Sequence, residues 1–71
     1  MNAKLEINIL NTPILVSLNN VLMEQFPDGV MVNADECSMT IFDADVASIT
    51  SNEDQDCFVM KNNSVLTFNW T

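Results

Sequence analysis

The sequence contains no arginine, histidine or tyrosine, and lysine occurs only twice among its 71 residues. Without histidine there is no Ser–His pair, and the two cysteines have no histidine with which to form a zinc site. The only glycine, Gly29, lies in a predicted turn, so the chain has no glycine-rich loop that could cradle a phosphate. We therefore expect no enzyme activity, no cofactor and no metal site.

The scarcity of basic residues also argues against two classes of direct ligand. Binding to nucleic acid or to an anionic membrane normally requires several lysines and arginines. Long apolar runs are missing as well, because polar residues interrupt the N-terminal third before the roughly 20 residues that a membrane-spanning helix needs. The same interruptions argue against a signal peptide. We expect a cytoplasmic protein in which Cys37 and Cys57 are reduced, packed thiols rather than a disulfide.

Acidic residues, in contrast, are abundant. Ten aspartates and glutamates give a formal net charge of −8, and residues 24–56 hold nine of them without a single base. These nine are Glu24, Asp28, Asp35, Glu36, Asp43, Asp45, Glu53, Asp54 and Asp56. Such a charge keeps the chain soluble and accelerates encounters with cationic surfaces, so we expect a positively charged partner.

The hydrophobic content predicts a folded protein despite this charge. Hydrophobic residues make up 48% of the chain, which is too much for an acidic disordered tail. Seventy-one residues suffice for a single domain, 1–71, near the lower size limit for a stable apolar core. Self-association is therefore an option from the outset.

The N-terminal half predicts one strand followed by one helix. Residues 4–10 alternate between apolar and polar, as a strand with one buried face does. Pro13 follows the capping candidate Thr12, and apolar residues then recur at three- and four-residue spacing, so a helix is predicted over 13–26. The turn signal at Pro27, Asp28 and Gly29 would end this helix.

The C-terminal half predicts strands alone. Residues 30–33 and 38–42 form a predicted hairpin in which Val32 faces Met39 and Val30 faces Ile41, and 46–50 is a candidate short strand. Residues 56–61 and 64–70 form a second hairpin. The expected fold class is α+β, with one helix packed on a mostly antiparallel sheet of four to five strands.

A two-residue turn at Asn62 and Asn63 is expected to close the second hairpin, because asparagine tolerates positive φ. This register divides the apolar side chains between two faces. One face carries Cys57, Val59, Leu66, Phe68 and Trp70, and the other carries Phe58, Met60, Val65 and Thr67. Trp70 is expected to fill the core. The second face is interpreted either as a further core layer or as a contact surface.

The acidic segment 43–56 matches a calcium-binding loop only in part. Asp43, Asp45 and Asp54 occupy the first, third and twelfth positions of the loop. However, Ser48 stands where the sharp turn needs glycine, and Ala47 stands at the fifth, ligand position. Solvated loop acids are the simpler interpretation, and a metal- or small-ligand-binding protein remains a third hypothesis.

Size, charge and layout together resemble the small acidic inhibitors that phages and mobile elements direct against host enzymes acting on nucleic acid. Examples are uracil-DNA glycosylase inhibitors, anti-restriction proteins and anti-CRISPR proteins. The resemblance covers the whole chain and involves no shared motif. In that group carboxylates occupy the places of DNA phosphates, and an apolar cleft often locks the complex. The resemblance implies an inhibitor that binds the basic surface of a host enzyme by DNA mimicry.

The predicted partner-binding surface joins loop acids to three apolar residues of the last hairpin. Its members are Asp35, Glu36, Asp43, Asp45, Glu53, Asp54, Asp56, Phe58, Met60 and Val65. The acids would accelerate association and the apolar residues would slow release. The alternative hypothesis is a small assembly module that forms a homo-oligomer through an exposed sheet face.

Overall fold

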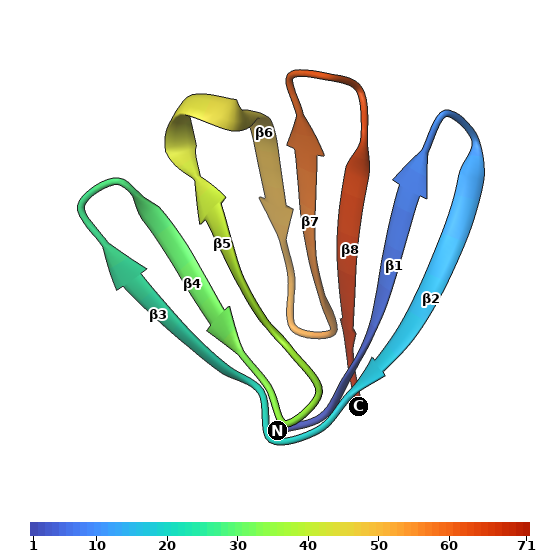
Figure 1. The fold of residues 1–71 in the computed structure, drawn as a ribbon, viewed down its shortest axis with the longest axis vertical. Coiled ribbons are helices and arrows are strands. Elements are labelled where there is room, and N and C mark those ends of the chain that lie inside the picture. Colours follow the sequence, from blue (N-terminus) through green and yellow to red (C-terminus); the bar gives the residue numbers. More distant parts are fainter.

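A computed structural model describes residues 1–71 as eight β-strands without an α-helix (Figure 1). A short 3-10 turn, η1 (Asp43–Asp45), connects the fifth strand to the sixth. The strands are β1 (Ala3–Ile9), β2 (Thr12–Leu18), β3 (Leu22–Phe26), β4 (Gly29–Asn33), β5 (Ser38–Phe42), β6 (Val46–Ser51), β7 (Gln55–Met60) and β8 (Val65–Trp70). The predicted α+β class is therefore wrong, and the fold is all-β. No helix in the structure has the length and apolar character needed to cross a membrane.

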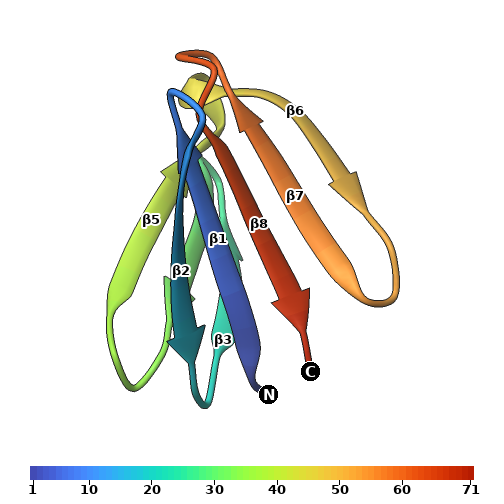
Figure 2. The same ribbon diagram turned by 90° about the vertical axis from the view of Figure 1, so that its right-hand side faces the viewer.

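The strands form two antiparallel sheets. The larger sheet has the order β2-β1-β8-β7-β6, and the smaller has the order β3-β4-β5. The strands spread like a fan from the end where both termini lie (Figure 1). Seen from the side, β5 and β6 meet at η1 and then diverge, so the two sheets splay apart (Figure 2). The chain passes between the sheets only at residues 19–21 and at η1.

The predicted helix over 13–26 is replaced by β2, a short link and β3. The run from Ile14 to Leu18 is apolar at nearly every position, so it fits the period of a strand as well as that of a helix. Asn19 and Asn20 then interrupt it. Asn20 adopts φ 54°, a left-handed conformation that asparagine tolerates and that cannot continue a right-handed helix.

The remaining strands occur where the sequence predicts them, with one error of register. The β4–β5 pairing places Val32 opposite Met39 and Val30 opposite Ile41, as predicted. In the β7–β8 hairpin, however, Phe58 faces Leu66. The turn occupies residues 61–63 rather than 62–63, because Met60 and Ser64 close it: the Met60 N–H donates to the Ser64 carbonyl at 2.8 Å. A shift of one residue moves one strand's side chains to the opposite face.

The corrected register changes which apolar residues share a face. Phe58, Met60, Leu66, Phe68 and Trp70 lie on the inner face of the five-stranded sheet, toward the smaller sheet. Cys57, Val59, Val65 and Thr67 lie on its outer face. The predicted grouping of Phe58 and Met60 with Val65 and Thr67 is therefore wrong.

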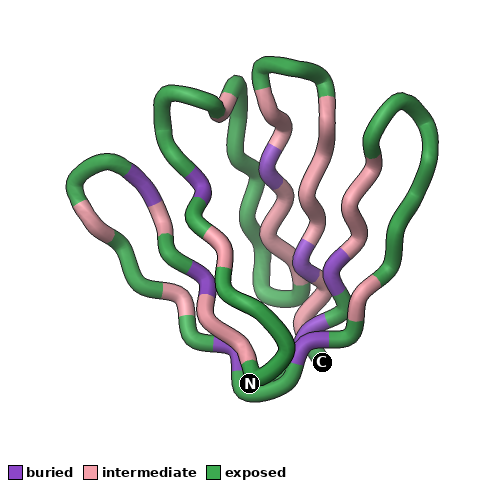
Figure 3. Tube along the Cα trace, in the orientation of Figure 1, coloured by how far each residue is buried: buried purple, intermediate pink, exposed green.

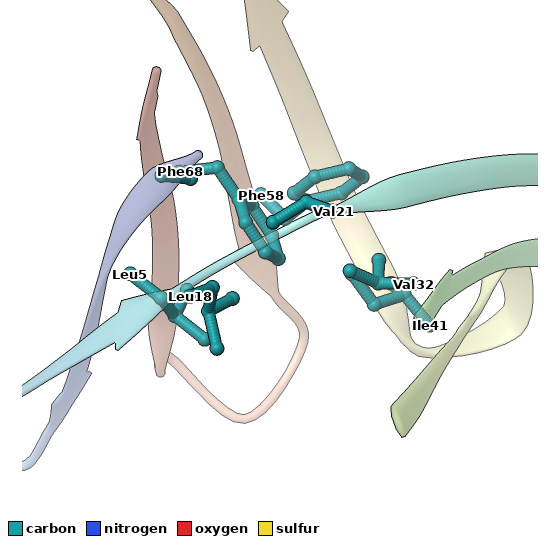
Figure 4. Packing of buried hydrophobic residues seen from close by; sticks show 8 residues of the cluster. Leu5, Leu18, Val21, Val32, Ile41, Phe58 and Phe68 are labelled. Atoms are coloured by element: carbon teal, nitrogen blue, oxygen red, sulfur yellow. The ribbon is translucent and has the colours of Figure 1, made fainter. Parts of the chain in front are cut away.

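The core lies where the inner faces of the two sheets meet (Figure 4). Its members are Ala3, Leu5, Leu18, Val21, Val32, Ile41, Phe58 and Phe68. Phe68 is completely buried. Its ring packs edge to face on that of Phe58, with 5.9 Å between the ring centroids, and stacks on that of Trp70, with 6.0 Å between the centroids. Burial of one such side chain contributes about 1.5–3 kcal/mol. As predicted, Trp70 packs against the core.

The core is small, because only nine of the 71 residues are buried. The turns at the broad end of the fan are exposed, whereas buried positions occur along the strands and near the termini (Figure 3). Gly29 is one of the buried residues although it lies on the outer face of β4. Phe26 and Phe42 lie opposite it on the two neighbouring strands. Their rings pack edge to face, with 6.3 Å between the ring centroids.

Candidate functional site

The acids chosen from the sequence lie in three separate groups. Asp43 and Asp45 belong to η1 at the broad end of the fan, where Asp28 also lies, since its carbonyl accepts the Asp43 N–H at 2.9 Å. Asp35 and Glu36 form the β4–β5 turn. The third group comprises Glu53 and Asp54 in the β6–β7 turn and Asp56 on β7. The β4–β5 and β6–β7 turns lie on opposite sides of the molecule (Figure 2). The predicted acids therefore do not form one continuous facet.

The side-chain hydrogen bonds of these carboxylates come from neutral groups. Asn19 and Asn20 donate to Glu36 and Asp35, while Ser51 and Trp70 donate to Asp56. Neutral donors hold a carboxylate in place without cancelling its charge. The formal charge of −8 consequently remains available to an external cation.

Asp35 and Glu36 have a structural role in addition to their charge. The Glu36 carboxylate accepts the Asn19 backbone N–H at 2.8 Å and its side-chain Nδ2 at 2.6 Å, and Asp35 accepts the Asn20 Nδ2 at 2.7 Å. Both acids thus attach the β4–β5 turn to the link between the two sheets. The hydrogen bonds from Asn19, first that of its backbone, lower the pKa of Glu36 below its ordinary value.

A cleft of about 290 Å³ lies between the inner faces of the two sheets. Met23, Gln25 and Val30 line it from the three-stranded sheet, and Ile49, Ser51, Asp56 and Phe58 line it from the five-stranded sheet. Its size is at the lower end of small-molecule sites, which span about 300–1,000 Å³. The cleft is therefore suited to a single side chain rather than to a large cofactor.

Asp56 is the only charged residue that lines this cleft, and the fold fixes its orientation. Trp70 Nε1 donates to its Oδ2 at 2.9 Å, and Ser51 Oγ donates to its Oδ1 at 2.5 Å. Each carboxylate oxygen can accept a second hydrogen bond. Neither lysine of the chain lines the cleft. The site therefore presents a fixed anion, free of an internal cation, beside apolar walls.

This arrangement matches a cation with an aliphatic stem. Lysine and arginine side chains place their methylene groups on apolar surface while the charged head seeks an anion. A charge-assisted hydrogen bond to a positioned carboxylate is roughly twice as strong as a neutral one. Asp56 is the only titratable residue that lines the cleft, so the lining offers no second group with which it could share general acid–base chemistry.

The three apolar residues proposed for the contact surface are distributed differently from the prediction. Phe58 is buried, and although it forms one wall of the cleft it chiefly belongs to the core. Met60 packs against the core, and Val65 lies on the opposite face of the sheet. No common surface joins them.

The sequence interpretation missed Ser51, Gln25 and Met23 as cleft residues and Trp70 as the support of Asp56. The correct hairpin register would have indicated Trp70, because it places Asp56 opposite Phe68, diagonal to Trp70 on the same face. The contribution of β3 had no sequence signal once residues 13–26 were interpreted as a helix.

The two cysteines are free thiols, as predicted, but they are not packed in the core. Cys37 is exposed and Cys57 is half-buried. The Cys57 Sγ accepts a hydrogen bond from Thr67 Oγ1 at 3.7 Å. Neither thiol lies in the cleft.

No protein family, curated protein or solved structure matches this chain.

Proposed function

We propose that this protein is an acidic cytoplasmic inhibitor that binds the basic, nucleic-acid-binding surface of a host enzyme. The observation that carries the proposal is the cleft between the sheets, where Asp56 presents a fixed and uncompensated carboxylate beside apolar walls. A lysine or arginine of the partner enters this cleft and pairs with Asp56. The surrounding acidic groups attract the partner before contact.

Charge density decides how such a protein competes with nucleic acid. The longest dimension of the molecule is 30 Å, and a duplex of that length carries about 18 phosphate charges. The chain carries a net charge of −8. It therefore imitates the sign of a duplex but not its full charge density, so the affinity must also come from a specific anchor. The cleft provides that anchor.

The three acidic groups supply the second part of the mechanism. They lie on different sides of a molecule whose extents are 30 × 28 × 23 Å. Each of these extents is larger than the Debye length, which is about 8 Å at physiological salt. Each group consequently pairs with a different patch of a basic groove. A protein seated in this way excludes nucleic acid by occupying the groove rather than by copying a phosphate ladder.

The test is capture of partners from a cell extract on the immobilised protein, with duplex DNA or structured RNA added as competitor. The proposal expects captured proteins that bind nucleic acid, are released by the competitor, and are retained less well as the salt concentration rises. Purified captured protein should lose its nucleic-acid binding when this chain is added. If the captured proteins are indifferent to both nucleic acid and salt, the proposal is wrong.

A further inference from the structure

β2 is an edge strand with one open side. It pairs with β1 on one side and has no neighbour on the other. The two-residue turn at Leu10 and Asn11 makes Ile9 and Thr12 the closing pair. In such hairpins the closing pair is hydrogen-bonded and the pattern then alternates, so the backbone groups of Pro13, Leu15 and Ser17 point away from β1. The N–H and C=O groups of Leu15 and Ser17 are therefore available to another strand.

The charge distribution singles out this edge. Residues 7–23 contain no charged side chain, although the chain as a whole carries −8. Of the other edge strands, β3 contains Glu24, while β5 and β6 adjoin the acids of η1. Charged side chains commonly protect the edge strands of natural sheets from pairing with another chain. β2 has no charged residue, and only Pro13 provides such protection. Two copies of the protein consequently meet with the least electrostatic repulsion along β2.

Apolar exposure is concentrated on the same hairpin. Four apolar residues of the hairpin are exposed: Ile9, Leu10, Ile14 and Leu15. The exposed fraction is 88% for Leu10 and 72% for Leu15. Leu10 also adopts φ 50°, a left-handed conformation for which glycine and asparagine are preferred. The left-handed backbone of Leu10 costs stability, and its side chain gains none in return because it stays exposed, which points to a contact that the single molecule does not make.

We propose that two copies of this chain pair through β2 in antiparallel orientation, with the two-fold axis at Leu15. The two Leu15 residues then exchange backbone hydrogen bonds, and the Ser17 N–H of each copy donates to the Pro13 carbonyl of the other. The missing N–H of Pro13 removes one bond on each side without blocking the pairing. Ile14 of each copy faces Val16 of the second copy, so the strand is complementary to itself. The two five-stranded sheets become one continuous sheet.

This dimer and the inhibitory complex respond to salt in opposite directions. Salt screens the repulsion between two molecules of charge −8, so it strengthens the dimer, whereas it weakens binding to a basic partner. The dimer also leaves the Asp56 cleft free, because β2 and β6 are opposite edges of the larger sheet. The failure of one proposal is therefore distinguishable from the failure of the other.

Sedimentation equilibrium of the purified protein at low and high salt tests the dimer. We expect a monomer–dimer equilibrium whose dimer fraction rises with salt, and at least a tenfold weaker association for Leu15→Lys. Leu22→Lys is the matched control, because it makes the same charge change at an exposed leucine of the smaller sheet and should leave the association unchanged. Ser17→Pro removes the outward N–H that would donate to Pro13 of the other copy, and should also weaken the dimer.

Thermal melts and NMR spectra of each variant establish that it is folded. If Ser17→Pro fails to fold, Leu15→Lys with its Leu22→Lys control still decides the question. A parent chain that stays monomeric at high salt and high concentration overturns the proposal. A dimer that survives Leu15→Lys overturns it as well, because the interface then lies elsewhere.

Discussion

At the scale of single residues, neutral side chains hold the carboxylates of this protein in place without neutralising them. The bonds from Trp70 and Ser51 to Asp56, and those from Asn19 to Glu36, are of this kind. For Glu36, the bonds from Asn19 favour the charged form of the acid over the protonated form. The two carboxylates differ in what they face, because Asp56 lines a cleft while Glu36 attaches a turn to the link between the sheets.

The role of Glu36 predicts a pH-dependent contribution to stability. Its pKa is lowered from 4.5 in the folded state, so it stabilises the fold above that pH and the contribution is lost as the pH falls through the folded value. Glu36→Gln should therefore lower the melting temperature at neutral pH, and the difference from the parent should narrow below pH 4.5. Asp54→Asn, which removes one loop charge from a carboxylate that accepts no side-chain hydrogen bond of this kind, is the control for the loss of charge itself. Melting curves from acidic to neutral pH check both; a constant difference for Glu36→Gln would contradict the account.

Gly29 is required because the outer face of β4 has no room at this position. A Cβ at residue 29 would meet the backbone oxygen of Ile41 and the Cα of Phe42. Gly29→Ala should therefore lower the free energy of unfolding by about 1–3 kcal/mol, the usual range for an overpacked site. Urea unfolding of the purified variant measures this change. An unchanged urea midpoint would contradict this account, because β4 and β5 could then move apart at Gly29 without a loss of stability.

At the scale of elements, the sequence predicts the strands well where polar and apolar residues alternate and fails where they do not. β1 alternates clearly and β5 does so over residues 38–41, and both strands occur as predicted. Residues 13–18 are nearly all apolar, so their period is ambiguous, and the burial of Leu18 and Val21 in the shared core favours the strands over a helix. Tertiary packing therefore decides this segment.

The β7–β8 hairpin shows a second limit of prediction at this scale. Both strands were predicted, but the register depends on turn geometry, and Asn62 and Asn63 are compatible with a shorter turn than the one that forms. One residue of difference decides whether Phe58 lies in the core or on the surface. For the same reason the acids could be listed from the sequence, whereas the cleft could not, because it combines β3 with β6 and β7.

The β1–β2 turn is not optimised for stability. Leu10 and Asn11 both have positive φ, the conformation that asparagine and glycine adopt readily at such turns. Leu10→Asn should raise the free energy of unfolding by about 1 kcal/mol, because a bulky side chain in the left-handed region costs roughly 1–2 kcal/mol. Urea unfolding at concentrations where the protein is monomeric measures the change. A loss of stability would show that Leu10 contributes contacts within the single chain.

At the scale of the whole molecule, a single net charge has two opposite consequences. Eight uncompensated negative charges attract a basic partner and repel another copy of the same chain. In the two associations proposed above, different parts of the fold are used: the acidic groups and the Asp56 cleft for the partner, and the uncharged β2 edge for the second copy. If both associations form, we expect salt concentration to shift the protein between them.

The most direct test compares Asp56→Asn with Asp54→Asn in affinity for the partner captured from cell extract. Both variants lose one negative charge, but only the first alters the cleft, and asparagine can still bond with Ser51 and Trp70. A charge-assisted hydrogen bond contributes about 1.5–3 kcal/mol, so Asp56→Asn should weaken binding by about 10- to 100-fold, while Asp54→Asn should change it only slightly. Equal, small losses for the two variants would contradict the account, because binding would then depend on total charge alone.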